Sequence, residues 1–272
     1  MTCRKWPPPR RQCNLIVTLP GSVLSTEDSL EAATFKAGFI ARALAVYRVD
    51  EVAIHYDPAT ERRHVRLLKS ILNYLAIPPH LRRKAVPRDP RLSHVGVLPP
   101  LRTPLHDAPH RIKEGMIIAG LVEKCHEGIC KIYIGKPGYV SVREKLRRGE
   151  IVVVKITSVS PPEAIVVEDP GFYAGYRVTV IPRDGLDQWL SAMKKNGYKI
   201  IGTSVRGECK APKASGREGV VVVFGGPKHG ISDYIDTGLI DELVNVIPLQ
   251  GTRTVRTEEA VHATLAQLKG CR

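Results

Sequence analysis

An α/β pattern runs through both ends of the chain and breaks off in the middle. Short apolar strands alternate with amphipathic helices up to about residue 91, and again from residue 169. Such alternation is typical of a parallel sheet with helices on its faces. Neither end contains enough strands to form this domain alone. We therefore predict one discontinuous α/β domain, residues 1–91 and 169–272, interrupted by an insertion at residues 92–168.

The N-terminal part shows the pattern clearly. The apolar run Cys13–Pro20, which is closed by Pro-Gly, predicts a buried strand. A helix is expected over residues 25–49, where Ser25 and Asp28 fit a capping box. A second strand and a second helix follow directly. This β-α-β-α order is the one expected of a parallel sheet.

The insertion has a different pattern. Short strands broken by glycine and proline occupy residues 111–167, which suits a small all-β barrel of the OB-like kind. Barrels of that class commonly bind single-stranded nucleic acid, and a barrel that serves only as a spacer is the alternative. The stretch from Cys125 to Cys130 reads as a hairpin tip. A metal site and a cross-strand disulfide are the two alternatives for this cysteine pair.

The charge of the chain indicates its partner. Lysine and arginine total 41 against 27 acidic residues, which gives a formal net charge of +14. Polyanions are the natural partners of such a surface, whereas a merely thermophile-like surface usually brings acids along with the bases. We predict a nucleic-acid partner. The expected RNA contacts crowd the linker and the insertion: Arg82, Arg83, Lys84, Arg88, Arg91, Arg143, Lys145, Arg147 and Arg148.

The sequence gives no sign of a membrane or secreted protein. No apolar run approaches the length of a membrane span, and the N-terminal apolar stretch is too short for a secretory signal. None of the six cysteines forms a CxxC pair. We expect a cytoplasmic protein without a bound metal.

Three glycine-bearing loops follow predicted strands in the C-terminal part. The stretches IIGTSVRGE, VVVFGGPKHG and NVIPLQGTR each end a buried run in this way. None of them fits a P-loop or a dinucleotide fingerprint, which weakens the alternative of a nucleotide-dependent enzyme. Ligands of open α/β sheets bind beyond the carboxyl ends of the strands, so the three loops together predict the wall of a pocket.

These same stretches carry a resemblance. Together with DPGFYAGYRV and the longer run VNVIPLQGTRTVRTEEAVHATLAQL, they resemble the SPOUT superfamily of RNA methyltransferases. Within it they are most similar to the archaeal and eukaryotic branch that carries an OB-like insertion. The resemblance covers Asn14 to Lys269, and RTVRTEEA is its most specific part.

The resemblance implies a trefoil knot in the C-terminal half, a homodimer, and S-adenosylmethionine as the methyl donor. The knot comes from the family alone, because knots are otherwise nearly absent from proteins. The implied donor-binding residues are Gly202, Thr203, Gly225, Gly226, Gly230, Ile247, Gln250, Gly251 and Thr252.

The implied reaction is methyl transfer to a structured RNA such as rRNA or tRNA, on a base nitrogen (uridine N3 is one candidate) or on a ribose. Arginine can hold a phosphate or stabilise a developing oxyanion, so Arg206, Arg253 and Arg256 are the catalytic candidates. Glu258 could orient an arginine or accept a proton. The alternative is that it only stabilises a helix N-terminus through its negative charge. A non-catalytic RNA-binding protein that keeps the fold is the alternative function.

Overall fold

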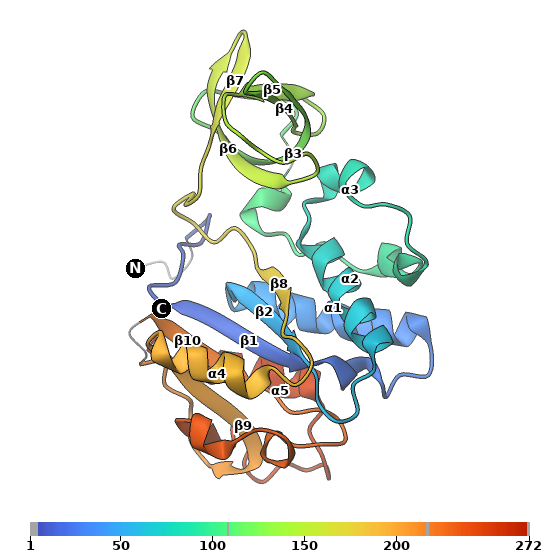
Figure 1. The fold of residues 1–272 in the computed structure, drawn as a ribbon, viewed down its shortest axis with the longest axis vertical. Coiled ribbons are helices and arrows are strands. Elements are labelled where there is room, and N and C mark those ends of the chain that lie inside the picture. The colour runs from blue at the N-terminus through green and yellow to red at the C-terminus, as the bar shows by residue number, and fades with distance from the viewer. Residues whose placement is uncertain (1–4, 108, 216–217, 271–272) are drawn as a thin grey trace. The chain divides into compact units, whose positions relative to one another are not determined.

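The computed structural model describes residues 5–107, 109–215 and 218–270. The chain forms two compact units, which are drawn in Figure 1. The sheet unit comprises Arg11–Asn73, Pro90–Pro99 and Gly175–Arg272. The barrel unit comprises Met1–Arg10, Tyr74–Asp89 and Pro100–Ala174. Each unit has its own hydrophobic core.

The sheet unit contains a six-stranded sheet in its described part, with strand order β11-β9-β10-β1-β2-β8. All neighbouring strands are parallel, and Val17 of β1 pairs with Val222 of β10 and with Val52 of β2. This confirms the predicted parallel α/β sheet. The strands are β1 (Asn14–Pro20), β2 (Glu51–His55), β8 (Arg177–Val180), β9 (Tyr198–Glu208), β10 (Gly219–Val223) and β11 (Glu242–Val244).

Helices cover both faces of this sheet. Leu186 and Leu190 of α4 pack on Ile16, Ala53 and Val221, and Figure 1 shows α4 in front of the strands with α1 behind them. Helices α1 and α5 pack on each other. The helices of the chain are α1 (Leu30–Val46), α2 (Arg62–Ala76), α3 (Pro79–Ala85), α4 (Leu186–Lys195) and α5 (Thr257–Gln267). Short 3-10 turns are η1 (Gly21–Leu24), η2 (Pro90–Leu92), η3 (Val95–Val97), η4 (Pro104–His106), η5 (Ile231–Asp233) and η6 (Thr237–Leu239).

Helix α1 begins later than the sequence predicts. The Oγ of Ser29 accepts a hydrogen bond from the backbone N–H of Ala32 at 3.0 Å, so Ser29 caps the helix. The predicted capping box of Ser25 and Asp28 is wrong. Residues 21–24 form the 3-10 turn η1, and Ser25 ends that turn instead of starting a helix.

The barrel unit contains a closed five-stranded barrel with strand order β3-β4-β5-β7-β6. Its core is formed by apolar side chains that alternate along the strands, such as Ile132, Val140 and Val154. This confirms the small all-β barrel predicted for the insertion. The strands are β3 (Ile117–His126), β4 (Ile129–Tyr133), β5 (Tyr139–Val142), β6 (Ile151–Val159) and β7 (Pro162–Val166).

Three further expectations have different outcomes. Cys125 and Cys130 face each other across the β3–β4 hairpin and form a disulfide, which decides between the two alternatives for that pair. The trefoil knot stays a prediction, because strand pairing alone does not specify how a chain threads. Among the described residues, no helix is both long enough and apolar enough to cross a membrane.

Candidate functional site

A cavity of about 510 Å³ lies in the sheet unit beyond the carboxyl ends of β9, β10 and β11. Its wall is built by the second half of β9, by the loops after β10 and β11, by the first turn of α5, and by a segment before and within α1. The prediction that IIGTSVRGE forms a loop beyond a strand is wrong, because this stretch continues the strand β9 to Glu208. The wall residues are Thr26, Glu27, Lys36, Thr203, Ser204, Val205, Phe224, Gly225, Gly226, Pro227, Gly230, Val244, Asn245, Val246, Ile247, Gln250, Arg253, Thr254, Val255, Arg256, Thr257 and Ala260. The cavity thus occupies the edge where open α/β sheets bind their ligands.

The structure brings most of the predicted donor-binding residues together in this wall. Those that line the cavity are Thr203, Gly225, Gly226, Gly230, Ile247 and Gln250. Gly202, Gly251 and Thr252 do not line it. Gly202 lies within β9, between Val223 of β10 and Leu243 of β11, and a Cβ on it would come within 2.5 Å of the Ile231 side chain. Gly251 and Thr252 are exposed, and a Cβ on Gly251 would meet nothing within 4 Å.

Gly226 is held against a buried carboxylate. A Cβ at this position would lie 2.6 Å from Oδ2 of Asp57 and 2.9 Å from Oγ of Ser22, so only glycine fits. Asp57 is 5% exposed and accepts hydrogen bonds from the hydroxyls of Ser22, at 2.8 Å, and Thr60. The hydroxyl of Thr257 donates to the Gly225 carbonyl at 3.2 Å. Contacts from η1, from the loop between β2 and α2, and from α5 therefore fix the shape of the glycine loop.

The four catalytic candidates divide into two groups. Arg253 and Arg256 line the cavity. Arg206 is exposed on β9 and is not part of the wall. Glu258 lies behind the wall, 14% exposed, with its carboxylate 3.9 Å from the guanidinium of Arg256 and 3.4 Å from the ammonium of Lys36. The predicted role of Glu258 in orienting Arg256 stays a prediction.

Sequence reasoning missed the part of the wall that comes from the N-terminal half. Lys36 of α1 is only 7% exposed, and its ammonium donates to Oγ1 of Thr26 and to Oε1 of Glu27, each at 2.9 Å. The hydrogen bond from Lys36 is the main cause that lowers the pKa of the Glu27 carboxyl. The available signal was a lysine among the apolar residues on the buried side of a helix, because such a charge requires partners.

A buried histidine lies at the end of β2. His55 is fully buried, and its Nε2 is 3.0 Å from the hydroxyl of Tyr234. Burial lowers the pKa of His55 to about 4, and burial also raises the pKa of the Tyr234 hydroxyl. Both side chains are therefore neutral near pH 7. Neither lines the cavity, so this pair belongs to the packing beneath the site.

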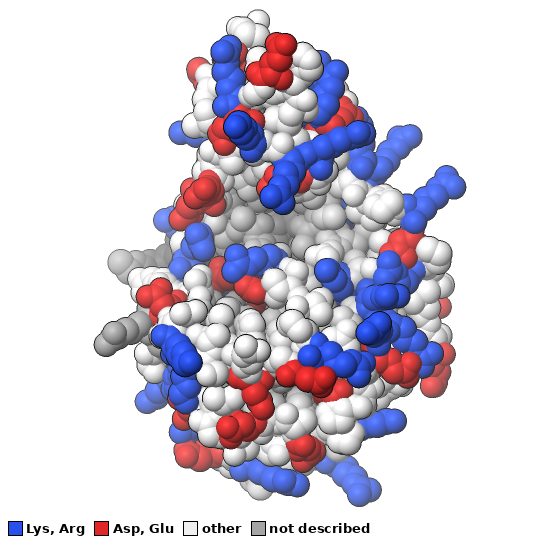
Figure 2. Space-filling view, in the orientation of Figure 1, with Lys and Arg blue, Asp and Glu red and all other residues white. Residues whose placement is uncertain are grey.

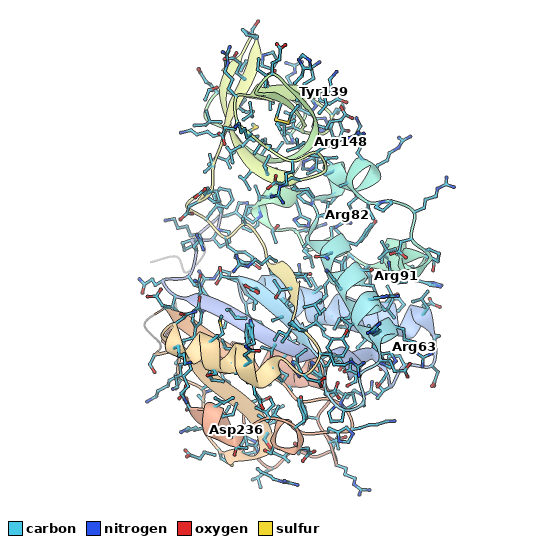
Figure 3. All side chains as sticks on the ribbon, in the orientation of Figure 1. Arg63, Arg82, Arg91, Tyr139, Arg148 and Asp236 are labelled. Carbon is cyan, nitrogen blue, oxygen red and sulfur yellow. A yellow bond between two sulfur atoms is a disulfide. The ribbon has the colours of Figure 1, made fainter. Side chains whose placement is uncertain are left out.

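The predicted RNA contacts differ in how far their charges are already engaged. Arg82 donates to the carbonyls of Ile77 and Leu75 and lies over the Tyr74 ring at 4.6 Å. Lys84 forms an ion pair with Glu123 and donates to the Tyr139 hydroxyl. The remaining predicted contacts are exposed: Arg83, Arg88, Arg91, Arg143, Lys145, Arg147 and Arg148. Figure 3 labels Arg82, Arg91, Tyr139 and Arg148.

A parallel α/β sheet with a glycine-lined cavity beyond its strand ends defines a ligand-binding α/β protein, and comparison with known proteins specifies the family. Residues 14–268 match the family described as "Putative RNA methyltransferase". The chain belongs to this family, which confirms the predicted class of RNA methyltransferase and makes RNA its substrate.

The relatives and solved structures are similar over most of this chain. An uncharacterised protein of Halobacterium salinarum is 32% identical and covers 93% of this chain and 97% of its own length. The human 28S rRNA (uridine-N(3))-methyltransferase is 30% identical over 95% of this chain and 78% of its own. The SpoU methyltransferase AviRb of Streptomyces viridochromogenes, solved with the cofactor AdoMet, is 11% identical with a TM-score of 0.41, and the match covers 96% of this chain and 58% of that one.

Proposed function

We propose that this chain transfers a methyl group from S-adenosylmethionine to N3 of a uridine in a structured ribosomal RNA. The observation that carries the proposal is the cavity at the carboxyl ends of β9, β10 and β11, with its wall of glycine-bearing loops. The choice of uridine N3 rests on the mouse, human and fly relatives, each of which is named a 28S rRNA (uridine-N(3))-methyltransferase.

The residues of the wall fit a donor of this kind. Small-molecule sites usually enclose roughly 300–1,000 Å³ and combine apolar walls with a few polar groups. Phe224, Val246 and Ile247 supply apolar surface, and Gly225 and Gly226 let the backbone approach the ligand closely. When bound, the donor supplies a methyl group that its sulfonium already activates. The task of the chain is then to orient the reactants and to exclude water.

Two arginines of the wall suit a uridine acceptor. N3 of uridine carries a proton, and its loss leaves negative charge on the oxygens beside it. The guanidinium groups of Arg253 and Arg256 can hold that charge or a nearby phosphate. Glu258, held by Lys36, keeps Arg256 in position. Arg206 lies outside the wall, so a catalytic role for it requires a second protomer.

We further propose that the enzyme is a homodimer. The exposed face of α1 carries Phe35, 42% exposed, and Phe39, 64% exposed, one helical turn apart. Helices usually turn charged residues to water, and aromatic side chains on a surface favour a protein partner. A second copy of the chain is the expected occupant of this face. Light scattering at low micromolar concentration tests it, and a mass near 30 kDa for an active enzyme would refute it.

Two further proposals come from the sequence. Residues 92–168 form an insertion that binds RNA, within an α/β domain made of residues 1–91 and 169–272. The enzyme works in the cytoplasm. Deleting the insertion and bridging it with a short Gly-Ser linker is expected to weaken RNA binding and to spare donor binding.

Two measurements test the main proposal. Isothermal titration with S-adenosylmethionine is expected to give one site per chain, and the non-catalytic alternative requires no binding. Mass spectrometry of ribosomal RNA from a deletion strain is expected to show the loss of one 3-methyluridine. Loss of a ribose-methylated nucleotide instead would keep the enzyme class and overturn the choice of N3.

A further inference from the structure

Helix α2 has one face made only of cations. Its fully exposed residues are Arg62, Arg63, Arg66 and Lys69, and we call this set the α2 cationic face. The opposite side of the helix is buried through Val65, Leu68 and Leu72. The helix sequence contains no acidic residue. Figure 2 shows blue side chains gathered over α2, and Figure 3 labels Arg63 among them.

Most of this charge is not neutralised within the chain. Arg63 forms an ion pair with Glu61 at 3.0 Å, and both side chains are largely exposed. Among the described residues, no ion pair or hydrogen bond engages the side chains of Arg62, Arg66 or Lys69. These three residues lie at spacings of four and three along the helix, so they line up on one side of it.

Helix stability does not explain this arrangement. The N-terminus of a helix carries partial positive charge, which favours acidic residues in the first turn and disfavours cations. Here the first turn contains Arg62 and Arg63 and no acid. Arg62 and Arg66 also repel each other as a like-charged i, i+4 pair. The cations are therefore placed where they disfavour the isolated helix, and they create a concentrated positive potential at its N-terminal end.

The position of the helix connects this potential with the cavity. Helix α2 follows β2, and β2 runs parallel to β1, β9 and β10, so its first turn lies at the edge of the sheet that holds the cavity. The loop between β2 and α2 supplies Asp57 and Thr60, which support Gly226 of the cavity wall. An anionic chain lying along α2 would therefore run toward the site.

We infer that the α2 cationic face binds the phosphate backbone of the substrate RNA and guides it toward the cavity. This inference rests on the proposed function and adds to it a binding surface within the sheet unit. With a rise of about 1.5 Å per residue, Arg62 and Lys69 are about 10 Å apart along the helix axis. That length matches a short run of consecutive phosphates. Guanidinium and ammonium groups grip such phosphates without reading sequence.

The test is a charge reversal in the full-length chain. The variant Arg66→Glu/Lys69→Glu is compared with Lys195→Glu/Lys213→Glu, which changes net charge equally at exposed positions elsewhere in the sheet unit. The probe is a fluorescein-labelled 20-nucleotide RNA hairpin with a uridine-rich loop. We expect the α2 variant to bind it at least about tenfold more weakly, and its salt dependence to fall by roughly 0.7 per lost contact. The control is expected to change less than about twofold, since it removes no contact.

Three readouts separate the possible outcomes. Equal RNA affinity of the α2 variant and the control would overturn the inference. Loss of binding to poly-glutamate with unchanged RNA binding would also overturn it, because it would indicate an acidic protein partner. Titration with S-adenosylmethionine is expected to be the same for both variants. Failure of the wild-type chain to bind the donor would instead count against the proposed function, whatever the RNA results.

Discussion

Several cations of the barrel unit and two cations of α2 differ in how far their charges are paired, although Lys145, Arg147 and Arg148 of the barrel unit are as exposed as those of α2. In the barrel unit, Lys84 is paired with Glu123, Arg143 lies 4.0 Å from Glu163, and Arg82 is engaged by backbone carbonyls. On α2, Arg66 and Lys69 have no such partner among the described residues. The difference teaches that a count of basic residues does not locate positive potential. Pairing decides which cations are available to a polyanion.

The largest expected difference between the two units is the loss of stability when a buried lysine and an exposed lysine are each replaced by Met. Replacing Lys36 by Met leaves the carboxylates of Glu27 and Glu258 without their shared cation. Breaking a buried ion pair typically destabilises a protein by about 3–5 kcal/mol. Lys84→Met is the matched change in the barrel unit, where Lys84 and Glu123 are both about a third exposed. We expect denaturant unfolding to show a large loss for the first variant and little change for the second.

Glycine substitutions sharpen the description of the site. Gly226→Ala places a methyl group 2.6 Å from the Asp57 carboxylate, so the loop must shift. We expect donor affinity to fall about a hundredfold, which corresponds to about 2.7 kcal/mol. Gly251→Ala meets nothing within 4 Å and is expected to bind the donor normally. Calorimetry with S-adenosylmethionine measures both, with circular dichroism as the folding control. Equal affinities would place the donor elsewhere.

The buried histidine His55 makes the stability of the sheet unit depend on pH. The pKa of His55 is lowered from 6.5 to about 4 by burial, so the unfolded chain takes up a proton at a pH where the folded chain does not. Neutral His55 therefore makes no demand on the free energy of unfolding above about pH 6.5. As the pH falls from there toward 4, the free energy of unfolding decreases, because the unfolded chain binds the proton and the folded chain does not. Between pH 7 and 5 this amounts to about 2 kcal/mol. Unfolding of His55→Asn measured across that range is expected to lack this part of the pH dependence.

Charge reversal in the barrel unit gives the smallest expected effect and bears directly on the comparison. Lys145, Arg147 and Arg148 are exposed on the segment between β5 and β6. Changing all three to Glu is expected to weaken binding of the RNA hairpin a few-fold, because these cations do not belong to the helix that begins at the cavity edge of the sheet. A larger loss than that of the α2 variant would reverse the order of the two surfaces. The variant Lys84→Glu serves as the comparison for a cation that is already paired, because Lys84 forms an ion pair with Glu123.

The sequence was sufficient for the general architecture because it depends on local patterns. Alternating strands and helices predicted the parallel sheet, and short strands between glycines predicted the barrel. The capping of α1 was misplaced by four residues, since Ser25 and Ser29 are both plausible caps and only the turn at residues 21–24 decides between them.

The candidate site could be predicted only in part. The glycine loops after β10 and β11 could be predicted, because a strand that ends in glycine allows close approach to a ligand. The stretch IIGTSVRGE was predicted as a third loop and is instead the second half of β9. Thr26, Glu27 and Lys36 could not be found in the same way, since only tertiary packing brings α1 to α5. Gly202 and Gly251 looked like their neighbours in the sequence, and their contacts differ only in three dimensions.

The wall of the cavity also has a consequence for protein synthesis. Its first contributor is Thr26 and its last is Ala260, so residues 26–260 must all be synthesised before the wall can close. A nascent chain that has emerged only as far as the barrel holds Lys36 and Glu27 but lacks Glu258 and every glycine loop. The hydroxyl of Thr257, which donates to the Gly225 carbonyl, is synthesised 32 residues after that carbonyl. We therefore expect this cavity to be incomplete in any nascent chain that has not yet reached Ala260.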